Sequence, residues 1–108
     1  MNLQNLISSY QKISHALDTK HPMTDKEKRV FAYITKMVEE FGELAEVSLA
    51  KANLQRDSKN LDNIQQKIAD EFADVMGSLL ILGIALDVDI EEAIKRKIVL
   101  TNTRLEIK

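Results

Sequence analysis

The stretch of sequence that decides the fold covers residues 61–86 and reads LDNIQQKIADEFADVMGSLLILGIAL. Its apolar residues recur at steps of three and four, which predicts a helix. These residues are Ile64, Ile68, Phe72, Val75, Leu79, Leu82 and Leu86. The second half of the segment is apolar on nearly every side, and a helix of that kind is buried all round. Because one small domain can hardly cover it, we expect a second subunit to do so.

The rest of the chain shows the same periodicity in three other segments. Helices are predicted over residues 3–17, from residue 24 to about residue 54, and from about residue 89 onward. The second starts with the capping-box pattern Thr24-Asp25-Lys26-Glu27, and the last starts with Asp89, a typical N-cap residue. The apolar stripe of the second helix consists of Val30, Ile34, Met37, Phe41 and Leu44. We therefore predict one all-α domain over residues 1–108, a four-helix bundle-like protomer that assembles into a homodimer or homotetramer.

The composition narrows the class of protein. The chain has 108 residues, a net charge of -2 and no cysteine, so disulfides and thiolate metal sites are excluded. This charge gives no general attraction to nucleic acid or to anionic membranes. The apolar run over residues 75–86 is shorter than the roughly 20 residues of a membrane-spanning helix. The first residues lack the pattern of a signal peptide, so the cytoplasm is the expected location.

Two pairs of carboxylates carry the candidate chemistry. Glu40 and Glu43 lie three residues apart, as do Glu71 and Asp74, so each pair can point to one place on its helix. Each pair sits on a shoulder of its apolar stripe, and the two shoulders can face each other if the stripes pack together. Four carboxylates so close together would require a cation, and an all-oxygen site suits Mg²⁺ or Mn²⁺. Lys36, one turn before Glu40, is interpreted as an i,i+4 ion-pair partner.

Two alternative interpretations compete with this metal site. Glutamate pairs at this spacing are also typical of a solvated helix face. A ferritin-like di-iron site needs Glu-x-x-His on two helices, and His15 and His21 both lie outside the second and third predicted helices. A redox iron site is therefore disfavoured.

The acidic segments resemble those of a known enzyme superfamily. The pattern Glu39-Glu40-x-x-Glu43, followed after a gap by Glu71-x-x-Asp74, is similar to the EExxE…ExxD signature of the MazG-type all-α nucleoside triphosphate pyrophosphohydrolases. That superfamily also includes dimeric dUTPases, dCTP pyrophosphatases and phosphoribosyl-ATP pyrophosphohydrolase. The likeness extends over roughly residues 27–105. Lys97 and Arg104 sit where a later K…N..R pattern of the superfamily has its Lys and Arg, but the Asn of that pattern falls at Thr101. The chain also contains no Trp, on which some members of the superfamily stack the base.

This resemblance implies an enzyme that hydrolyses a (deoxy)nucleoside triphosphate to the monophosphate and pyrophosphate, as in nucleotide-pool housecleaning. It implies that Mg²⁺ or Mn²⁺ is held by Glu40, Glu43, Glu71 and Asp74. Glu39 would support the metal ligands as an outer carboxylate or act as a base, while Lys97 and Arg104 would contact phosphates. Base recognition would use Phe31, Tyr33, Tyr10 or a neighbouring subunit. The competing functions are a non-catalytic helical oligomerisation module and a regulatory nucleotide-binding protein.

Overall fold

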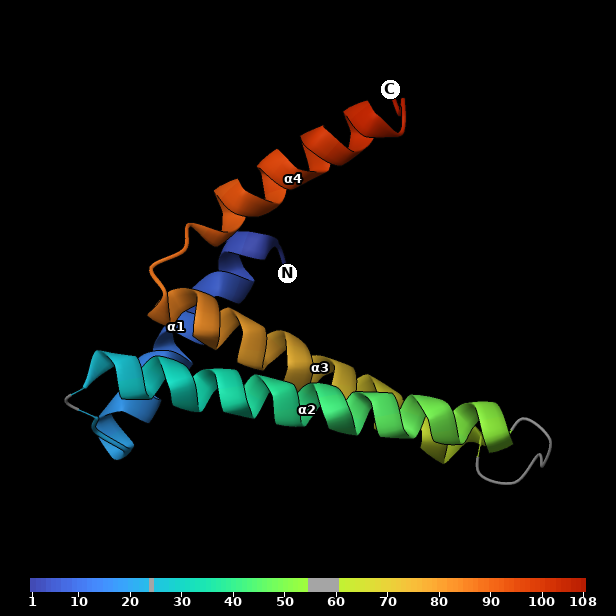
Figure 1. The fold of residues 1–108 in the computed structure, drawn as a ribbon, viewed down its shortest axis with the longest axis horizontal. Helices are drawn as coiled ribbons and strands as arrows, with labels where there is room; N and C mark the ends of the chain where they lie inside the picture. The colour runs from blue at the N-terminus through green and yellow to red at the C-terminus, as the bar shows by residue number, and fades with distance from the viewer. Residues whose placement is uncertain (24, 55–60) are drawn as a thin grey trace.

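The computed structural model describes residues 1–23, 25–54 and 61–108, and these residues form four helices (Figure 1). The helices are α1 (Leu3–Lys20), α2 (Lys26–Leu54), α3 (Leu61–Ala85) and α4 (Ile90–Arg104). The described part of the chain thus confirms the all-α prediction. The predicted connection over residues 55–60 lies outside the described residues.

Side-chain caps fix where the helices begin. The Asp25 carboxylate accepts a hydrogen bond of 2.9 Å from the backbone N–H of Glu27 at the start of α2. The Asp89 carboxylate accepts one of 3.2 Å from the N–H of Glu92 at the start of α4. Such bonds satisfy amides that have no partner within the helix. The predicted Asp89 cap is therefore confirmed, and Asp25 caps α2, while the predicted role of Thr24 falls outside the described residues.

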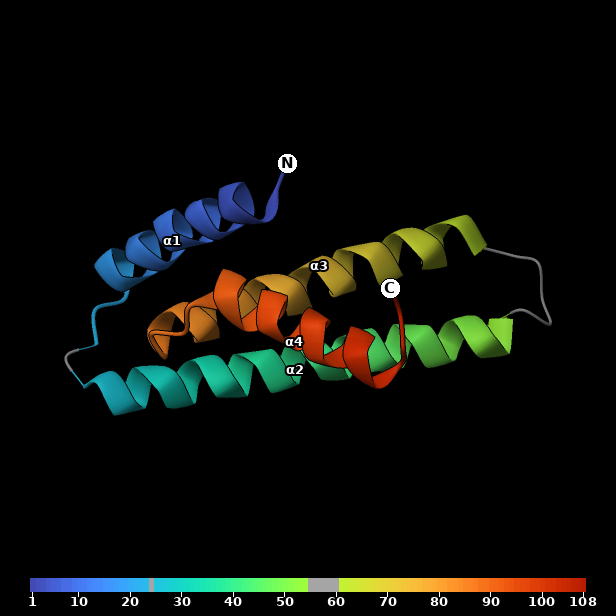
Figure 2. The ribbon, with the colours of Figure 1, turned by 90° about the horizontal axis from the view of Figure 1, so that it is seen from above.

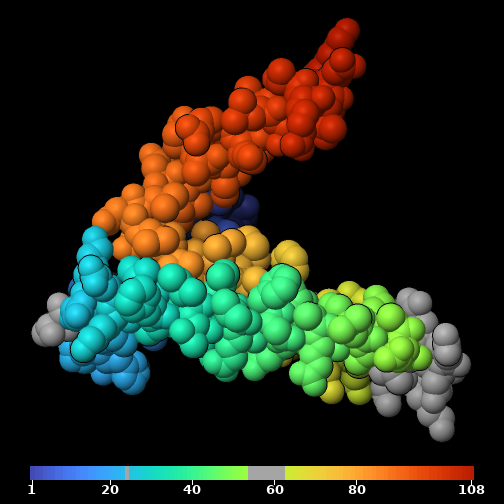
Figure 3. Space-filling model, in the orientation of Figure 1, coloured from blue at the N-terminus to red at the C-terminus, as the bar shows by residue number. Residues whose placement is uncertain are grey.

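Two of the helices form an antiparallel pair. α2 and α3 run side by side along their length, and α1 packs on α3 from the side away from α2 (Figures 1 and 2). α4 leaves this group after a short turn and extends outward (Figures 1 and 3). The α2–α3 pair is thus the frame on which any site between helices must be built.

No helix in the described part of the chain combines the length and the apolar character that a membrane span requires.

A glycine sets the close approach of α1 to α3. A Cβ atom added to Gly77 would lie 2.6 Å from the hydroxyl oxygen of Tyr10 and 2.8 Å from its Cε1. Atoms that are not bonded do not approach so closely, and only a residue without a side chain leaves room for the ring. Tyr10 therefore packs against the backbone of α3, at the α1–α3 contact.

Some residues of the predicted apolar stripes on α2 and α3 are exposed in the single chain. Phe41 on α2 is 60% exposed and Phe72 on α3 is 58% exposed, although both were predicted to lie on the packed faces. Glu40, predicted on a shoulder, is only 8% exposed. Within the single chain the other helices therefore leave both phenylalanines uncovered. Periodicity defines an apolar face but does not say which neighbour covers it. Within the chain, the carboxylate side of α2 faces α3 and the phenylalanines face outward.

The chain exposes far more surface than a monomer of its size. Its accessible surface is 8444 Å². A folded monomer of 12.3 kDa is expected to expose about 6,100 Å², so the excess is about 2,300 Å². α4 contains no buried residue, and its exposed side chains include Ile98, Val99 and Leu100. A helix of 15 residues with so little packing is only marginally stable in water.

Candidate metal centre

Three of the four predicted ligands meet between two helices. Glu40 and Glu43 lie one turn apart on α2, and Glu71 lies on α3. One carboxylate oxygen from each of these residues can be chosen so that all three lie within 4.8 Å of one another. The antiparallel pairing of α2 and α3 brings them together, because the residues are about thirty positions apart in the sequence. We call Glu40, Glu43 and Glu71 the acidic cluster.

Part of the acidic cluster is withdrawn from water. Glu40 is buried, and Glu71 is half-buried. The Oε2 atoms of both residues are inaccessible and accept no hydrogen bond from the described residues. A buried carboxylate oxygen without a partner is costly, and such atoms in folded proteins are usually satisfied by a donor, a water molecule or an ion. These two oxygens of the acidic cluster are therefore free to coordinate an ion or to accept a hydrogen bond from water.

The charges of the cluster act on one another. The negative charge of Glu40 raises the pKa of the Glu43 carboxyl above its ordinary value, and loss of hydration and the nearby Glu71 act in the same direction. Like charges in close proximity oppose ionisation, whereas a cation between them would favour it. Without a cation, the Glu43 carboxyl therefore holds its proton more tightly than an isolated glutamate would.

Lys36 supplies one positive charge at the edge of the cluster. Its Nζ lies 3.0 Å from Oε1 of Glu40 and 3.7 Å from Oε1 of Glu39. This geometry confirms the predicted i,i+4 ion pair. The interaction with Glu40 and the nearby charge of Glu39 raise the pKa of Lys36. Lys36 thus neutralises one carboxylate of the acidic cluster and leaves the other two.

The remaining predicted residues lie apart from the acidic cluster. Asp74 follows Glu71 by one turn on α3, is exposed, and is outside the group of oxygens within 4.8 Å. Glu39 is exposed and pairs with Lys36. Lys97 and Arg104 are on α4, which extends away from the α2–α3 pair (Figure 1). The structure therefore does not bring the predicted phosphate-binding residues to the cluster of their own chain.

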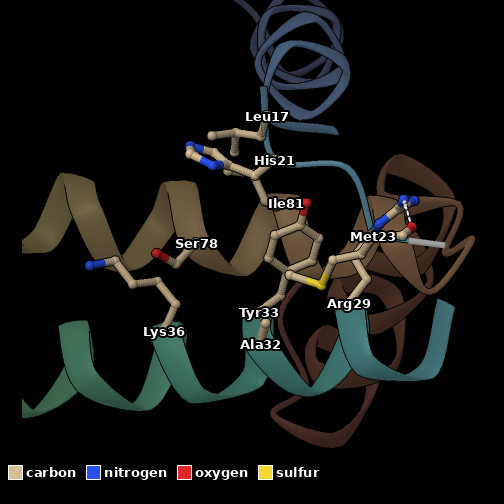
Figure 4. A pocket seen from close by; sticks show the side chains of 9 residues that line it. All are labelled: Leu17, His21, Met23, Arg29, Ala32, Tyr33, Lys36, Ser78 and Ile81. Atoms are coloured by element: carbon tan, nitrogen blue, oxygen red, sulfur yellow. Dashed lines mark hydrogen bonds between the residues drawn. The ribbon is translucent and has the colours of Figure 1, made fainter. Parts of the chain in front are cut away.

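A pocket of about 380 Å³ adjoins the cluster (Figure 4). The end of α1 and the segment after it, α2 and α3 all contribute to its walls, which are mainly apolar. The residues that line it are Leu17, His21, Met23, Arg29, Ala32, Tyr33, Lys36, Ser78 and Ile81. Of the predicted base-binding residues, Tyr33 lines this pocket, whereas Phe31 is 63% exposed. Periodicity could not have revealed the pocket, because it is created by the angle at which the end of α1 meets the other two helices.

Hydrogen bonds hold the wall of this pocket. The Tyr33 hydroxyl donates to Asp18 over 3.0 Å, and burial together with this bond raises the pKa of Tyr33. The guanidinium of Arg29 donates to the backbone carbonyl of Met23 over 2.6 Å and lies 3.4 Å from the Asp18 carboxylate. These contacts connect the end of α1 and the segment after it to the first turns of α2.

Comparison of the chain with protein-family models, with curated proteins and with solved structures finds no match.

Proposed function

We propose that this protein is a MazG-type nucleoside triphosphate pyrophosphohydrolase that uses Mg²⁺, or Mn²⁺, at the acidic cluster. One observation supports this proposal above the others: oxygens of three carboxylates from two helices lie within 4.8 Å of one another. Like charges this close oppose one another's ionisation, and a cation held between them would compensate for this. The resemblance of the surrounding sequence to that superfamily supplies the reaction class.

The residues present fit a hard divalent cation. The donor set consists of oxygen alone, which is the preference of Mg²⁺ and Mn²⁺. Two buried oxygens, Oε2 of Glu40 and Oε2 of Glu71, accept no hydrogen bond from the described residues and are available as ligands. Glu40, Glu43 and Glu71 would hold the cation, and Asp74 would join them from the next turn of α3. Because Asp74 is exposed and outside the cluster, its participation is the least supported of the four.

The proposed reaction is hydrolysis of the α–β phosphoanhydride. When bound, the divalent cation supplies charge neutralisation for the triphosphate and activation of water. Water attacks the α-phosphorus, the bond to the bridging oxygen breaks, and pyrophosphate leaves together with a nucleoside monophosphate. The protein contributes mainly by positioning and by electrostatic stabilisation. Glu39, exposed beside Lys36, would serve as an additional carboxylate that accepts a proton.

Assembly into a homodimer or homotetramer belongs to the same proposal. The excess surface of about 2,300 Å² per chain is in the range that obligate subunit interfaces bury. α4 is the helix with the greatest need of a partner, because none of its residues is buried within the chain. If Lys97 and Arg104 contact phosphates, they would do so at the acidic cluster of a neighbouring subunit, since α4 extends away from its own.

The test is a panel of nucleoside triphosphates with Mg²⁺, in which pyrophosphate and orthophosphate are both quantified. Pyrophosphate release supports the proposed reaction, whereas release of orthophosphate alone would show cleavage between the β- and γ-phosphates and contradict it. Glu71→Gln and Asp74→Asn should each reduce turnover by at least about a hundredfold while the protein stays helical, an effect typical of removing a group that stabilises charge in the transition state.

A matched control distinguishes the cluster from ordinary surface charge. Glu46 is an exposed glutamate one turn beyond Glu43 on α2, so Glu46→Gln should retain wild-type turnover. If Glu71→Gln and Asp74→Asn are as active as Glu46→Gln, the metal site is wrong. The alternative, a non-catalytic oligomerisation module, predicts neither turnover nor binding of Mg²⁺ in any of these variants. A regulatory nucleotide-binding protein would bind nucleotide with Mg²⁺ and leave it intact.

A further inference from the structure

Lys36 belongs to two features at once. Its ammonium group is paired with Glu40 of the acidic cluster, over 3.0 Å, while the same side chain lines the adjoining pocket. The side chain is 56% exposed, so the protein does not lock it in this position, whereas the Glu40 side chain is only 10% exposed. Figure 4 shows Lys36 and Ser78 side by side at one end of the pocket, with the ammonium group pointing away from Tyr33. The lysine therefore stands between the pocket and the cluster.

The pairing with Glu40 competes with a divalent cation. A cation held by Glu40, Glu43 and Glu71 needs the Glu40 carboxylate, and a positive charge 3.0 Å from that carboxylate would repel it. Lys36 has a long, flexible stem, so it can leave Glu40 without a change in the backbone. The other oxygen of Glu40 accepts no hydrogen bond from any residue that the structure describes, and Glu40 is only 8% exposed, which indicates that Lys36 does not fully satisfy the carboxylate.

The pocket indicates where the released ammonium group would find a new partner. Its volume of about 380 Å³ and its mainly apolar walls are typical of sites for ring-containing small molecules. A ring system lying against Tyr33 and Ile81 would direct its attached groups to the end where Lys36 and Ser78 lie. An anionic chain leaving that end would meet Lys36, whose ammonium group lies 3.0 Å from Glu40 of the acidic cluster. This is the arrangement that a nucleotide requires, with the nucleoside in the pocket and the phosphates beside Lys36.

We propose that Lys36 exchanges partners: it neutralises Glu40 in the metal-free protein and, when a divalent cation takes Glu40, contacts the phosphate chain of a nucleotide whose nucleoside occupies the pocket. The inference rests on the proposed function, because it requires the acidic cluster to hold the cation. Lys36 then couples the two binding events: the cation binds first and displaces Lys36 from Glu40, and the nucleotide binds second and contacts the displaced ammonium group. Without the exchange, Lys36 would serve only as a counter-ion that weakens metal binding.

The experiment measures binding rather than turnover. Mn²⁺ affinity without nucleotide is measured by titration followed by electron paramagnetic resonance. The affinities of the four α,β-imido deoxynucleoside triphosphates are measured by calorimetry at saturating Mn²⁺. Lys36→Met should tighten Mn²⁺ binding by about two- to fivefold, the size of one exposed ion pair. It should weaken binding of the preferred analogue by about tenfold or more, as expected for loss of a hydrogen bond between charged groups.

The chain offers a matched control in Lys95, which forms another exposed i,i+4 pair of 3.3 Å with Glu91 on α4. Lys95→Met should leave both affinities unchanged, and Lys36→Arg, which keeps the charge and checks the fold, should retain analogue binding. Unchanged or weaker Mn²⁺ binding by Lys36→Met would overturn the exchange, as would unchanged analogue binding. If the wild type binds no Mn²⁺, or binds it no better than Glu71→Gln, the metal site itself is wrong. That result differs from one in which the wild type binds Mn²⁺ and Lys36→Met does not change its affinity, which contradicts only the exchange.

Discussion

Replacement of Ile98 tests whether α4 is covered by another copy of the chain. Ile98 is 53% exposed on a helix that has no buried residue, so its removal should leave the packing of the other three helices unchanged. Full burial of such a side chain is worth about 1.5–3 kcal/mol. Burial of the exposed half on assembly is then worth about 0.8–1.5 kcal/mol per copy, and a twofold interface contains two copies. Ile98→Ala should therefore weaken dimerisation by about 1.5–3 kcal/mol, or about 13- to 150-fold in Kd.

Sedimentation equilibrium over a wide range of protein concentrations measures this change directly. Ile98→Asp should dissociate the assembly further, because the interface would then bury an unpaired charge. Arg96→Ala, which removes an exposed side chain from the side of the same helix opposite Ile98, is the control and should assemble like the wild type. A wild-type protein that sediments at 12.3 kDa with α4 fully helical would refute the reasoning, because the excess surface would then be stable in water.

Three further predictions concern single elements of the structure. Gly77→Ala should cost about 1–3 kcal/mol of stability in urea unfolding, since its Cβ would lie 2.6 Å from Tyr10, and adding Tyr10→Ala should make the two losses non-additive. In the metal-free wild-type protein, the folded state binds the Glu43 proton more tightly than the unfolded state, because the pKa of Glu43 is raised above its ordinary value of 4.5. The free energy of unfolding should therefore fall as the pH rises from 4.5 through the raised pKa. Glu43→Gln should flatten this dependence, as should Mg²⁺, and a steeper decline in the variant would contradict the repulsion from Glu40. Asp89→Ala should cost α4 about 1 kcal/mol and speed amide hydrogen exchange in that helix by about fivefold, whereas Asp89→Ser should have little effect.

The helical elements could be predicted from local patterns because their causes are local. The cap at Asp89 and the three- and four-residue apolar steps of α3 depend on neighbouring residues, so their positions agree with the structure to within a few residues. The Lys36–Glu40 ion pair was predictable for the same reason, since both side chains lie on one face of one helix. The rotation of α2 about its axis was not predictable, and Phe41 is exposed where the apolar stripe indicated burial.

The sequence by itself determined that this chain is helical and that acidic residues recur at one-turn spacing on two of its helices, since both are set by residues three or four positions apart. Only the tertiary structure decided that Glu40 and Glu43 meet Glu71, that a pocket opens beside Lys36, and that no residue of α4 is buried within its own chain. Each of these depends on the angle and rotation between helices distant in sequence. Those quantities are set by the packing of side chains such as Tyr10 on Gly77, which no periodicity along a single helix contains.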